Sequence, residues 1–327
     1  MNRLILNYLV IATVAVSVVF TSCKKDEYKD KDIYVAGTNG NTAIVWKNGV
    51  AQNLTDGTRR AMANSIYVLG NDVYVAGYER NEQEIDIAKL WKNGVSQNLT
   101  DGSTDAFAFS VYVFDNDVYV AGYEWNIYRT AIAKLWKNGV AQNLTDGNNG
   151  ISAFALSVFV SGSDVYVAGQ IGRKAVLWKN EVAQNLTDGK SWAGISSIYV
   201  SGNDVYVVGY EETEQKKSLA KLWKNGNSQN LTNGNNHTSA SSIYVANDDV
   251  YIAIDEWDES CKHTAKLWKN GTIQNLTDGN AYPYSVFVAG KDVYVSGVVN
   301  SRAVLWKNGK AQNITGAYAH SVFVVEK

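Results

Sequence analysis

Short segments rich in valine, isoleucine and tyrosine follow one another along the chain after residue 31, separated by links rich in glycine and asparagine. In one stretch these segments cover residues 65–68, 72–77, 88–91 and 97–100. β-Branched and aromatic residues of this kind are typical of strands in a packed sheet. Asn93-Gly94 joins the last two segments and favours a two-residue hairpin. Because no segment has a 3.6-residue apolar period, the pattern predicts an all-β protein.

The four-segment pattern occurs seven times along the chain. Each copy carries an Asp-(Val/Ile)-Tyr segment, then a Trp-Lys-Asn triplet, then a Gln-Asn-(Leu/Ile)-Thr run. The triplets begin at Trp46, Trp91, Trp136, Trp178, Trp223, Trp268 and Trp306. Their intervals of 45, 45, 42, 45, 45 and 38 residues predict propeller blades built of short strands, and not a helical solenoid.

The two ends of the repeat region complement each other. The first copy starts directly at its second strand, residues 32–35, whereas residues 321–324 form a first strand with nothing after it. We therefore expect the tail to complete the first blade and close the ring. The pattern resembles the seven-bladed β-propellers, with a strand order nearest to the NHL-type blade. That resemblance implies four-stranded antiparallel blades over residues 32–327 and implies no activity.

Residues 1–22 have the pattern of a secretory signal peptide: Arg3, an apolar run from Leu4 to Phe20, and small residues before Cys23. The small residues at this cysteine resemble the lipobox of bacterial lipoproteins. The resemblance implies that Cys23 becomes the lipidated, palmitate-bearing N-terminus and that residues 23–31 form a short tether. Lys24 stands where an aspartate would imply inner-membrane retention, which favours the outer membrane. The alternative is an uncleaved anchor helix, since the apolar run is near the lower limit for a membrane span.

Composition narrows the function classes. The 327 residues include 30 basic and 32 acidic side chains, so no cationic surplus supports a nucleic-acid partner. One proline and 19% charged residues exclude a long disordered chain. Two cysteines form no disulfide framework, and with Cys23 acylated the remaining thiol is Cys261.

Residues repeated in every copy have plain structural roles. We predict that the seven tryptophans and the tyrosine of each Asp-(Val/Ile)-Tyr segment pack between blades. The aspartate of that segment is expected to form turn hydrogen bonds, because a calcium loop needs several oxygen ligands at alternating positions. The seven Trp-Lys-Asn lysines are expected to form a solvated rim, with a cationic ring facing anionic lipid as an alternative. Seven equivalent ligand sites, as in some lectin propellers, stay open as another alternative.

The links between the strands vary in length at one end of each blade only. Links from the second to the third strand differ, since Gly77 to Trp91 spans 14 positions and Gly169 to Trp178 spans 9. Variable loops on a rigid scaffold are where binding residues concentrate. The alternative is that these links vary freely and a few aromatic residues hold them down. The side chains that we expect to bind a ligand there are Trp125, Tyr128, Trp192, Trp257, Tyr282, Tyr284, His237 and His263.

Solvent-exposed aromatic rings among polar groups suit a sugar or a peptide. The sequence therefore predicts a non-catalytic binding or scaffold module for a glycan or protein at the cell envelope, held to the membrane by its lipid, without a metal or cofactor. The rival is a propeller-type hydrolase or lyase acting on an envelope or extracellular polysaccharide, although no catalytic residue stands out. His237 and His263 could share a metal in that case. A purely structural role in an envelope complex is a third possibility.

Overall fold

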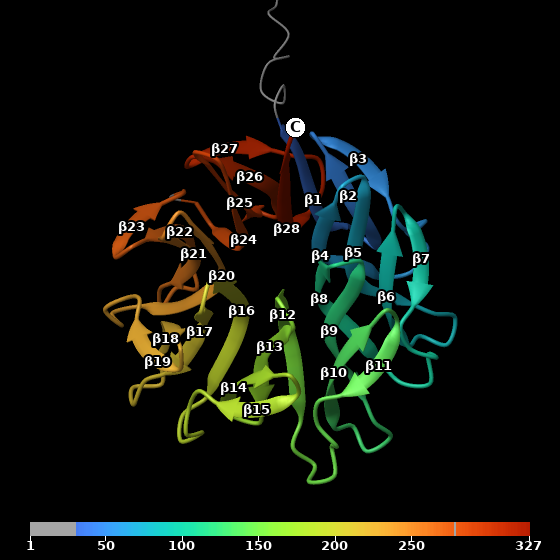
Figure 1. Ribbon diagram of the computed structural model, residues 1–327. Helices are drawn as coiled ribbons and strands as arrows, with labels where there is room; N and C mark the ends of the chain where they lie inside the picture. Colours follow the sequence, from blue (N-terminus) through green and yellow to red (C-terminus); the bar gives the residue numbers. More distant parts are fainter. Residues whose placement is uncertain (1–30, 278) are drawn as a thin grey trace, which may run out of the picture.

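The computed structural model describes residues 31–277 and 279–327. Within this part, 28 strands form seven antiparallel four-stranded sheets arranged as blades around a central axis (Figure 1). The chain is thus a seven-bladed β-propeller, as predicted. No helix among these residues has the length and apolar character to cross a membrane. The predicted signal peptide and Cys23 lie outside the described residues.

The blades follow one another along the chain, and the first strand of each lies innermost. Blade 1 contains β28 (Tyr318–Glu326), β1 (Lys31–Asn39), β2 (Thr42–Lys47) and β3 (Val50–Asn53). Blade 2 contains β4 (Ala61–Leu69), β5 (Asp72–Arg80), β6 (Asp86–Lys92) and β7 (Val95–Asn98). Blade 3 contains β8 (Ala106–Phe114), β9 (Asp117–Trp125), β10 (Ala131–Lys137) and β11 (Val140–Asn143). Blade 4 contains β12 (Ala153–Ser161), β13 (Asp164–Ile171), β14 (Lys174–Lys179) and β15 (Val182–Asn185).

The remaining three blades repeat the same order. Blade 5 contains β16 (Ala193–Ser201), β17 (Asp204–Glu212), β18 (Ser218–Lys224) and β19 (Asn227–Asn230). Blade 6 contains β20 (His237–Ala246), β21 (Asp249–Trp257), β22 (His263–Lys269) and β23 (Thr272–Asn275). Blade 7 contains β24 (Ala281–Ala289), β25 (Asp292–Val299), β26 (Arg302–Lys307) and β27 (Lys310–Asn313).

Strand bounds differ from the predicted ones in a regular way. The outer strand predicted at 97–100 lies at Val95–Asn98, because the turn at Asn93 (φ 52°) and Gly94 (φ 82°) lets pairing resume at once. The first two strands of each blade extend further than predicted, as β4 and β5 show. Several residues placed in links therefore lie at strand ends. In blade 4 the non-glycine turn residue Glu181 adopts φ 69°, the strained conformation expected there.

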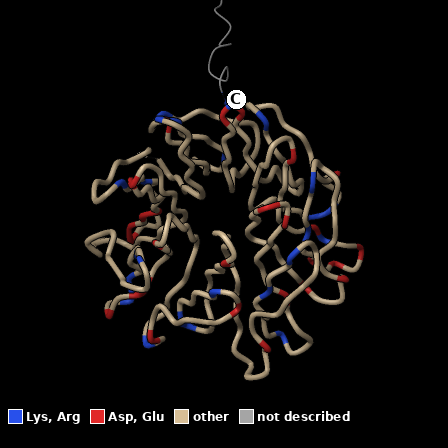
Figure 2. Tube along the Cα trace, viewed as in Figure 1, with Lys and Arg blue, Asp and Glu red and all other residues tan. Residues whose placement is uncertain are grey.

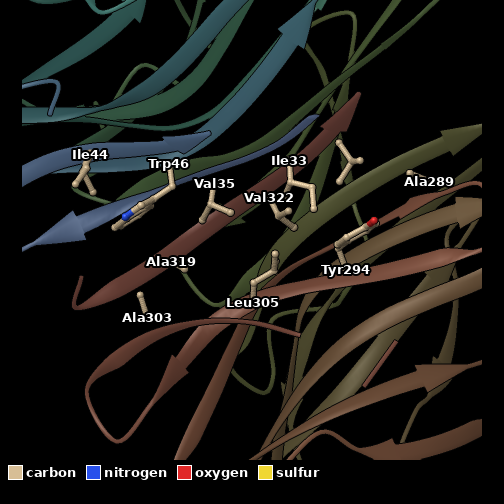
Figure 3. Packing of buried hydrophobic residues seen from close by; sticks show 11 residues of the cluster. Ile33, Val35, Ile44, Trp46, Ala289, Tyr294, Ala303, Leu305, Ala319 and Val322 are labelled. Atoms are coloured by element: carbon tan, nitrogen blue, oxygen red, sulfur yellow. The ribbon is translucent and has the colours of Figure 1, made fainter. Parts of the chain in front are cut away.

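The chain ends close the ring as predicted. β28 pairs with β1 in antiparallel register, with Tyr34 opposite Phe323, and completes blade 1. At the joint with blade 7, Trp46 packs in a buried cluster with Tyr294 and Leu305. Figure 3 shows the cluster, with Trp46 towards one end and Tyr294 towards the other. Trp46 is 1% exposed, so the closure seals a dry interface.

The repeated tryptophans pack between blades, which confirms their predicted role. Six of them are at most 1% exposed and Trp268 is 6% exposed. Burying each ring contributes at most about 4–6 kcal/mol to stability. In six of the seven blades, a glycine on the second strand lets the tryptophan ring approach the sheet. In blade 3, a Cβ atom on Gly122 would collide with the Phe107 carbonyl and lie 2.9 Å from the Trp136 ring.

A ring of serine hydroxyls joins the innermost strands. Each of these strands has a β-bulge, as between Ala63 and Ser65 in blade 2. The serine after the bulge accepts a hydrogen bond from a backbone N–H of the next blade. The seven donor–acceptor pairs are Ile66–Ser321, Val111–Ser65, Val158–Ser110, Ile198–Ser157, Ile243–Ser197, Val286–Ser242 and Val322–Ser285. The chain of contacts returns to its start and so forms a closed circle.

The face that carries the two-residue turns is neutralised by repeated ion pairs. In blade 2, Asp72 accepts a hydrogen bond from Asn93 and lies 2.8 Å from the Lys92 ammonium group, which sits over the Tyr74 ring. All seven copies have the Asp–Lys ion pair. The expected turn hydrogen bonds are confirmed. Each of these lysines has a carboxylate partner, so the ring they form is not purely cationic. Figure 2 shows both signs of charge interspersed around the disc.

Replacing Ser157 with alanine should lower the free energy of unfolding by about 1–3 kcal/mol, because it leaves the buried N–H of Ile198 without an acceptor. Urea unfolding measures the change. Ser163→Ala, in an exposed turn, is the matched control and should stay within about 0.5 kcal/mol of wild type. An equal effect of both substitutions would contradict a stabilising role for the serine ring.

Asp32 makes the fold acid-sensitive at the ring closure. Burial raises its pKa, but hydrogen bonds from Asn48, Lys327 and Lys47 outweigh burial and lower the pKa to about 2. The stabilisation is complete above the unfolded pKa and is lost as the pH falls towards 2. The free energy of unfolding of wild type should fall between pH 5 and pH 2. In Asp32→Asn this fall should be smaller by about 1–2 kcal/mol. Urea unfolding across this range provides the measurement, and unchanged pH dependence in the variant would overturn the assignment.

Candidate ligand-binding face

All variation in link length lies on one face of the disc, as predicted. Each link between a first and a second strand, and each link between a third and a fourth strand, is a two-residue turn. In blade 1 the chain makes no link between the first two strands, because β28 is the last strand in the described part of the chain and β1 is the first. On the opposite face, the links between second and third strands have two residues in blades 1, 4 and 7 and five residues in blades 2, 3, 5 and 6. We call this opposite face the variable face.

The five-residue links share one rigid conformation. In blade 3, the Asn126 side chain accepts hydrogen bonds from the N–H groups of Tyr128 and Thr130, and Arg129 adopts φ 57°. Asn81 makes the same pair of bonds in blade 2. This turn lifts Tyr128 to the loop tip, where it is 82% exposed. Tyr128 thus lies apart from the other predicted binding residues.

Trp125 belongs to an aromatic cluster on blades 3 and 4. Its ring meets Tyr123 and Phe154 edge-on, at centroid distances of 6.0 and 6.3 Å. Phe107 packs against Tyr123 at 5.2 Å. Burial raises the pKa of Tyr123 to about 12. These neighbours pack against the Trp125 ring, so Trp125 is part-buried where the sequence predicted a solvent-exposed ring.

Beside this cluster lies an open pocket of about 650 Å³ between blades 2 and 3. Its lining includes Thr104, Asp105, Trp125, Asn126, Ile127 and Arg129. The pocket thus brings an indole ring together with a carboxylate, a guanidinium and an amide. We call it the Trp125 pocket.

Trp192 stands alone at another place on the variable face. It is 43% exposed, and the Arg173 guanidinium lies 5.3 Å from its ring centroid. The residue lies in the link before β16, and Arg173 lies in the two-residue turn of the preceding blade. A cation over an indole face is a favourable contact that orients the ring.

Four predicted residues form one stack on blades 6 and 7. His237, Trp257 and His263 lie opposite one another across β20, β21 and β22. Adjacent strands are about 4.8 Å apart, so the three rings stack, with centroid distances of 5.3 and 5.5 Å. Tyr282 of β24 covers the far side of His263 at 4.1 Å. We call these four side chains the histidine stack.

The histidine stack overturns two expectations. Trp257 lies between His237 and His263, so these imidazoles share no metal ion. Both faces of the Trp257 ring are covered, so this indole offers no free surface to a sugar. Both histidines lie in blade 6. In the described ranges, no group of three His, Cys, Asp or Glu residues has metal-binding geometry.

Asp255 holds His263 in place. The His263 Nδ1 atom lies 2.9 and 3.0 Å from the two carboxylate oxygens, and both side chains are largely buried. Burial raises the pKa of Asp255, and the hydrogen bond from His263 opposes this shift. His237 has a different role, since its Nδ1 accepts the backbone N–H of Ser218 from blade 5.

Tyr284 and His320 both lie at bulge positions of innermost strands. Their rings are 5.2 Å apart, and Tyr318 stacks on His320 at 5.8 Å. Burial lowers the pKa of His320 to about 4, so its imidazole is neutral at physiological pH. Burial likewise raises the pKa of Tyr284.

Two side chains on the variable face, Asp255 of blade 6 and His320 of blade 1, were not among the residues predicted to bind a ligand. Asp255 occupies the position after the second-strand glycine, where blades 2, 3 and 5 have Tyr78, Tyr123 and Tyr210. Aligning the seven copies would have revealed this departure. The contact of His320 with Tyr284 crosses a blade boundary and needs the closed ring.

Comparisons with known proteins support the fold. No protein-family model and no curated protein sequence matches the chain. A chain from a structural and mechanistic analysis of two prolyl endopeptidases aligns over 91% of this chain at 11% identity, with a TM-score of 0.53. A puromycin-hydrolysing peptidase of Mycobacterium tuberculosis aligns over 79% at 12% identity, also with a TM-score of 0.53. A chain of a nidogen–laminin complex aligns over 89% at 8% identity, with a TM-score of 0.47.

This chain spans about half the length of the two peptidases, 50% and 47%. At such low identity, these likenesses establish the propeller architecture alone. The class of protein is therefore a seven-bladed β-propeller.

Trp192 should dominate the accessible tryptophan fluorescence, because it is 43% exposed and the seven repeated tryptophans are at most 6% exposed. Trp192→Phe should lower the acrylamide quenching constant more than Trp257→Phe, whose ring is covered on both faces. Steady-state quenching measures both variants. Equal effects would show that the loop before β16 is packed differently from the structure.

Proposed function

We propose that the chain is a lipid-anchored binding module of the cell envelope that recognises a glycan on its variable face. The observation that carries the proposal is the Trp125 pocket, where an indole ring lies beside Asp105, Arg129 and Asn126. Sugars combine an apolar ring face with hydrogen-bonding edges, so an aromatic platform with a few polar groups suits them. A module that binds protein, or only assembles in an envelope complex, is the competing role.

The rigidity of the pocket supports specific recognition. Asn126 is fixed by its two backbone hydrogen bonds, and Asp105 accepts the backbone N–H of Asp86 from the preceding blade. The Trp125 ring packs nearly perpendicular to the rings of Tyr123 and Phe154, which hold it in place. A pocket whose polar groups are already oriented loses little side-chain entropy when it binds a ligand.

The position of the chain ends supports presentation away from a membrane. β1 begins at Lys31, which pairs with Glu326. This end of blade 1 lies on the face opposite the variable face. A lipid tether at Cys23 would therefore leave from the face opposite the variable face. Eight residues, 24–31, span at most about 28 Å. In this arrangement the disc stays near the bilayer with its pocket turned outward.

The test is glycan-array screening of the full chain in detergent micelles, followed by calorimetry with the best-bound glycan. Trp125→Ala should weaken binding at least about tenfold, because it removes the stacking platform. Phe114→Ala is the matched control, since this exposed aromatic residue ends β8 on the face opposite the variable face, and the affinity of the variant should stay within about twofold of wild type.

Two results would contradict the proposal. The wild-type chain could bind no glycan, or wild type and Trp125→Ala could bind the glycan with equal affinity. Circular dichroism and thermal unfolding of each variant separate lost binding from lost folding. Crosslinking of the full chain in cells to an envelope protein, without glycan binding, would favour the competing protein-binding role instead.

A further inference from the structure

Blades 3 and 6 provide an internal comparison. Both have a five-residue link, both follow a blade with such a link, and both precede a blade with a two-residue link. Trp125 and Trp257 end the second strand at the same position, opposite Ala131 and His263 respectively. Blade 3 therefore serves as the reference for packing, and the residues that differ in blade 6 are the additions to explain.

Blade 6 replaces an apolar set with a polar one. At equivalent register positions Tyr123 becomes Asp255, Ala131 becomes His263, Phe154 becomes Tyr282, Phe107 becomes Ser239 and Phe109 becomes Ser241. Blade 3 is well packed with its aromatic residues, so the fold does not need the polar ones. Burying a carboxylate and an imidazole costs free energy relative to an apolar pair. Several polar replacements at neighbouring positions, made at that cost in stability, indicate that these side chains have a chemical role.

His263 is held rigidly with one ring nitrogen left over. Asp255 takes up Nδ1, and Trp257 and Tyr282 cover the two faces of the ring. Within the described residues, no hydrogen bond involves Nε2, and the side chain is 17% exposed. A carboxylate at Nδ1 favours the Nδ1–H tautomer, which leaves the lone pair on Nε2. The arrangement therefore presents a preoriented base.

We propose that His263 is the general base of a second site on this chain, which hydrolyses carboxylic esters, and that Asp255 is its positioning residue. The proposal is independent of the glycan pocket, which lies on other blades. An ester fits best because hydrolysis of a glycosidic bond needs a pair of carboxyl groups flanking that bond. The carboxylate here is already bound to His263.

The reaction balances without a further reactant. Water adds through its oxygen to the ester carbonyl carbon while one of its protons passes to His263 Nε2. The tetrahedral intermediate then breaks its bond to the alcohol oxygen, which takes the proton from Nε2. The products are a carboxylic acid and an alcohol, and the imidazole returns to its neutral form.

The full chain in detergent micelles would be assayed for repeated turnover of p-nitrophenyl acetate. His263→Gln should lower kcat/KM at least about 100-fold, the usual contribution of a general base. His320→Gln removes another histidine, one whose Nε2 is buried, and should leave the rate within about twofold of wild type. Thermal unfolding of each variant shows whether it is folded.

Asp255→Asn tests the positioning role separately. Nitrogen NMR of the His263 imidazole should show the Nδ1–H tautomer in wild type and a mixture in the variant, with lower kcat and little change in KM. Asp255→Glu should restore part of the rate. The proposal is overturned if wild type turns over the ester no faster than free imidazole at equal concentration, if folded His263→Gln keeps more than half the rate, or if Asp255→Asn changes neither the tautomer nor kcat.

Discussion

The innermost strands set the constraint on which this ring depends. Each is an edge strand, so one row of its backbone N–H and C=O groups has no neighbouring strand to pair with. The serine after each bulge accepts one of these N–H groups from the next blade. The contacts run in one direction, so Ile66 of blade 2 has its acceptor, Ser321, only when β28 lies in blade 1. Closure by the tail thus completes one blade and satisfies the next.

This ring contains two kinds of blade. Blades 2, 3, 5 and 6 have the five-residue link and a part-buried Glu–Lys ion pair on their second and third strands, as between Glu79 and Lys89. Blades 1, 4 and 7 have the short link and Ile44, Val176 or Val304 at the lysine position. The longer hairpins extend further towards solvent, so a charged pair there keeps partial contact with water. Link length and strand chemistry therefore changed together.

The repeat made the blade count, the ring closure and the packing role of Trp46 and its counterparts predictable from the sequence. Each copy repeats the same local signals, and Asn-Gly turns fix the hairpin register. The site was less predictable, because it depends on which side chains lie opposite one another across strands. His237 and His263 are 26 positions apart in sequence. In the sheet, Trp257 lies directly opposite each of them and so stands between them. The strands also ran further than their apolar cores indicated, which moved these residues from links into the sheet.

Blade 6 departs from the repeat in its core as well as on its face. Ile254 occupies the position that is glycine in the other six blades, and Trp268 is the most exposed of the seven repeated tryptophans, at 6%. A blade under selection for packing alone would converge on the arrangement of its neighbours, since each departure costs stability. A closed ring tolerates one such blade, because the serine contacts and core clusters hold it from both sides. The loss of stability therefore falls in the blade that also carries the polar replacements. This coincidence links the irregular core of blade 6 to the chemistry proposed for its surface.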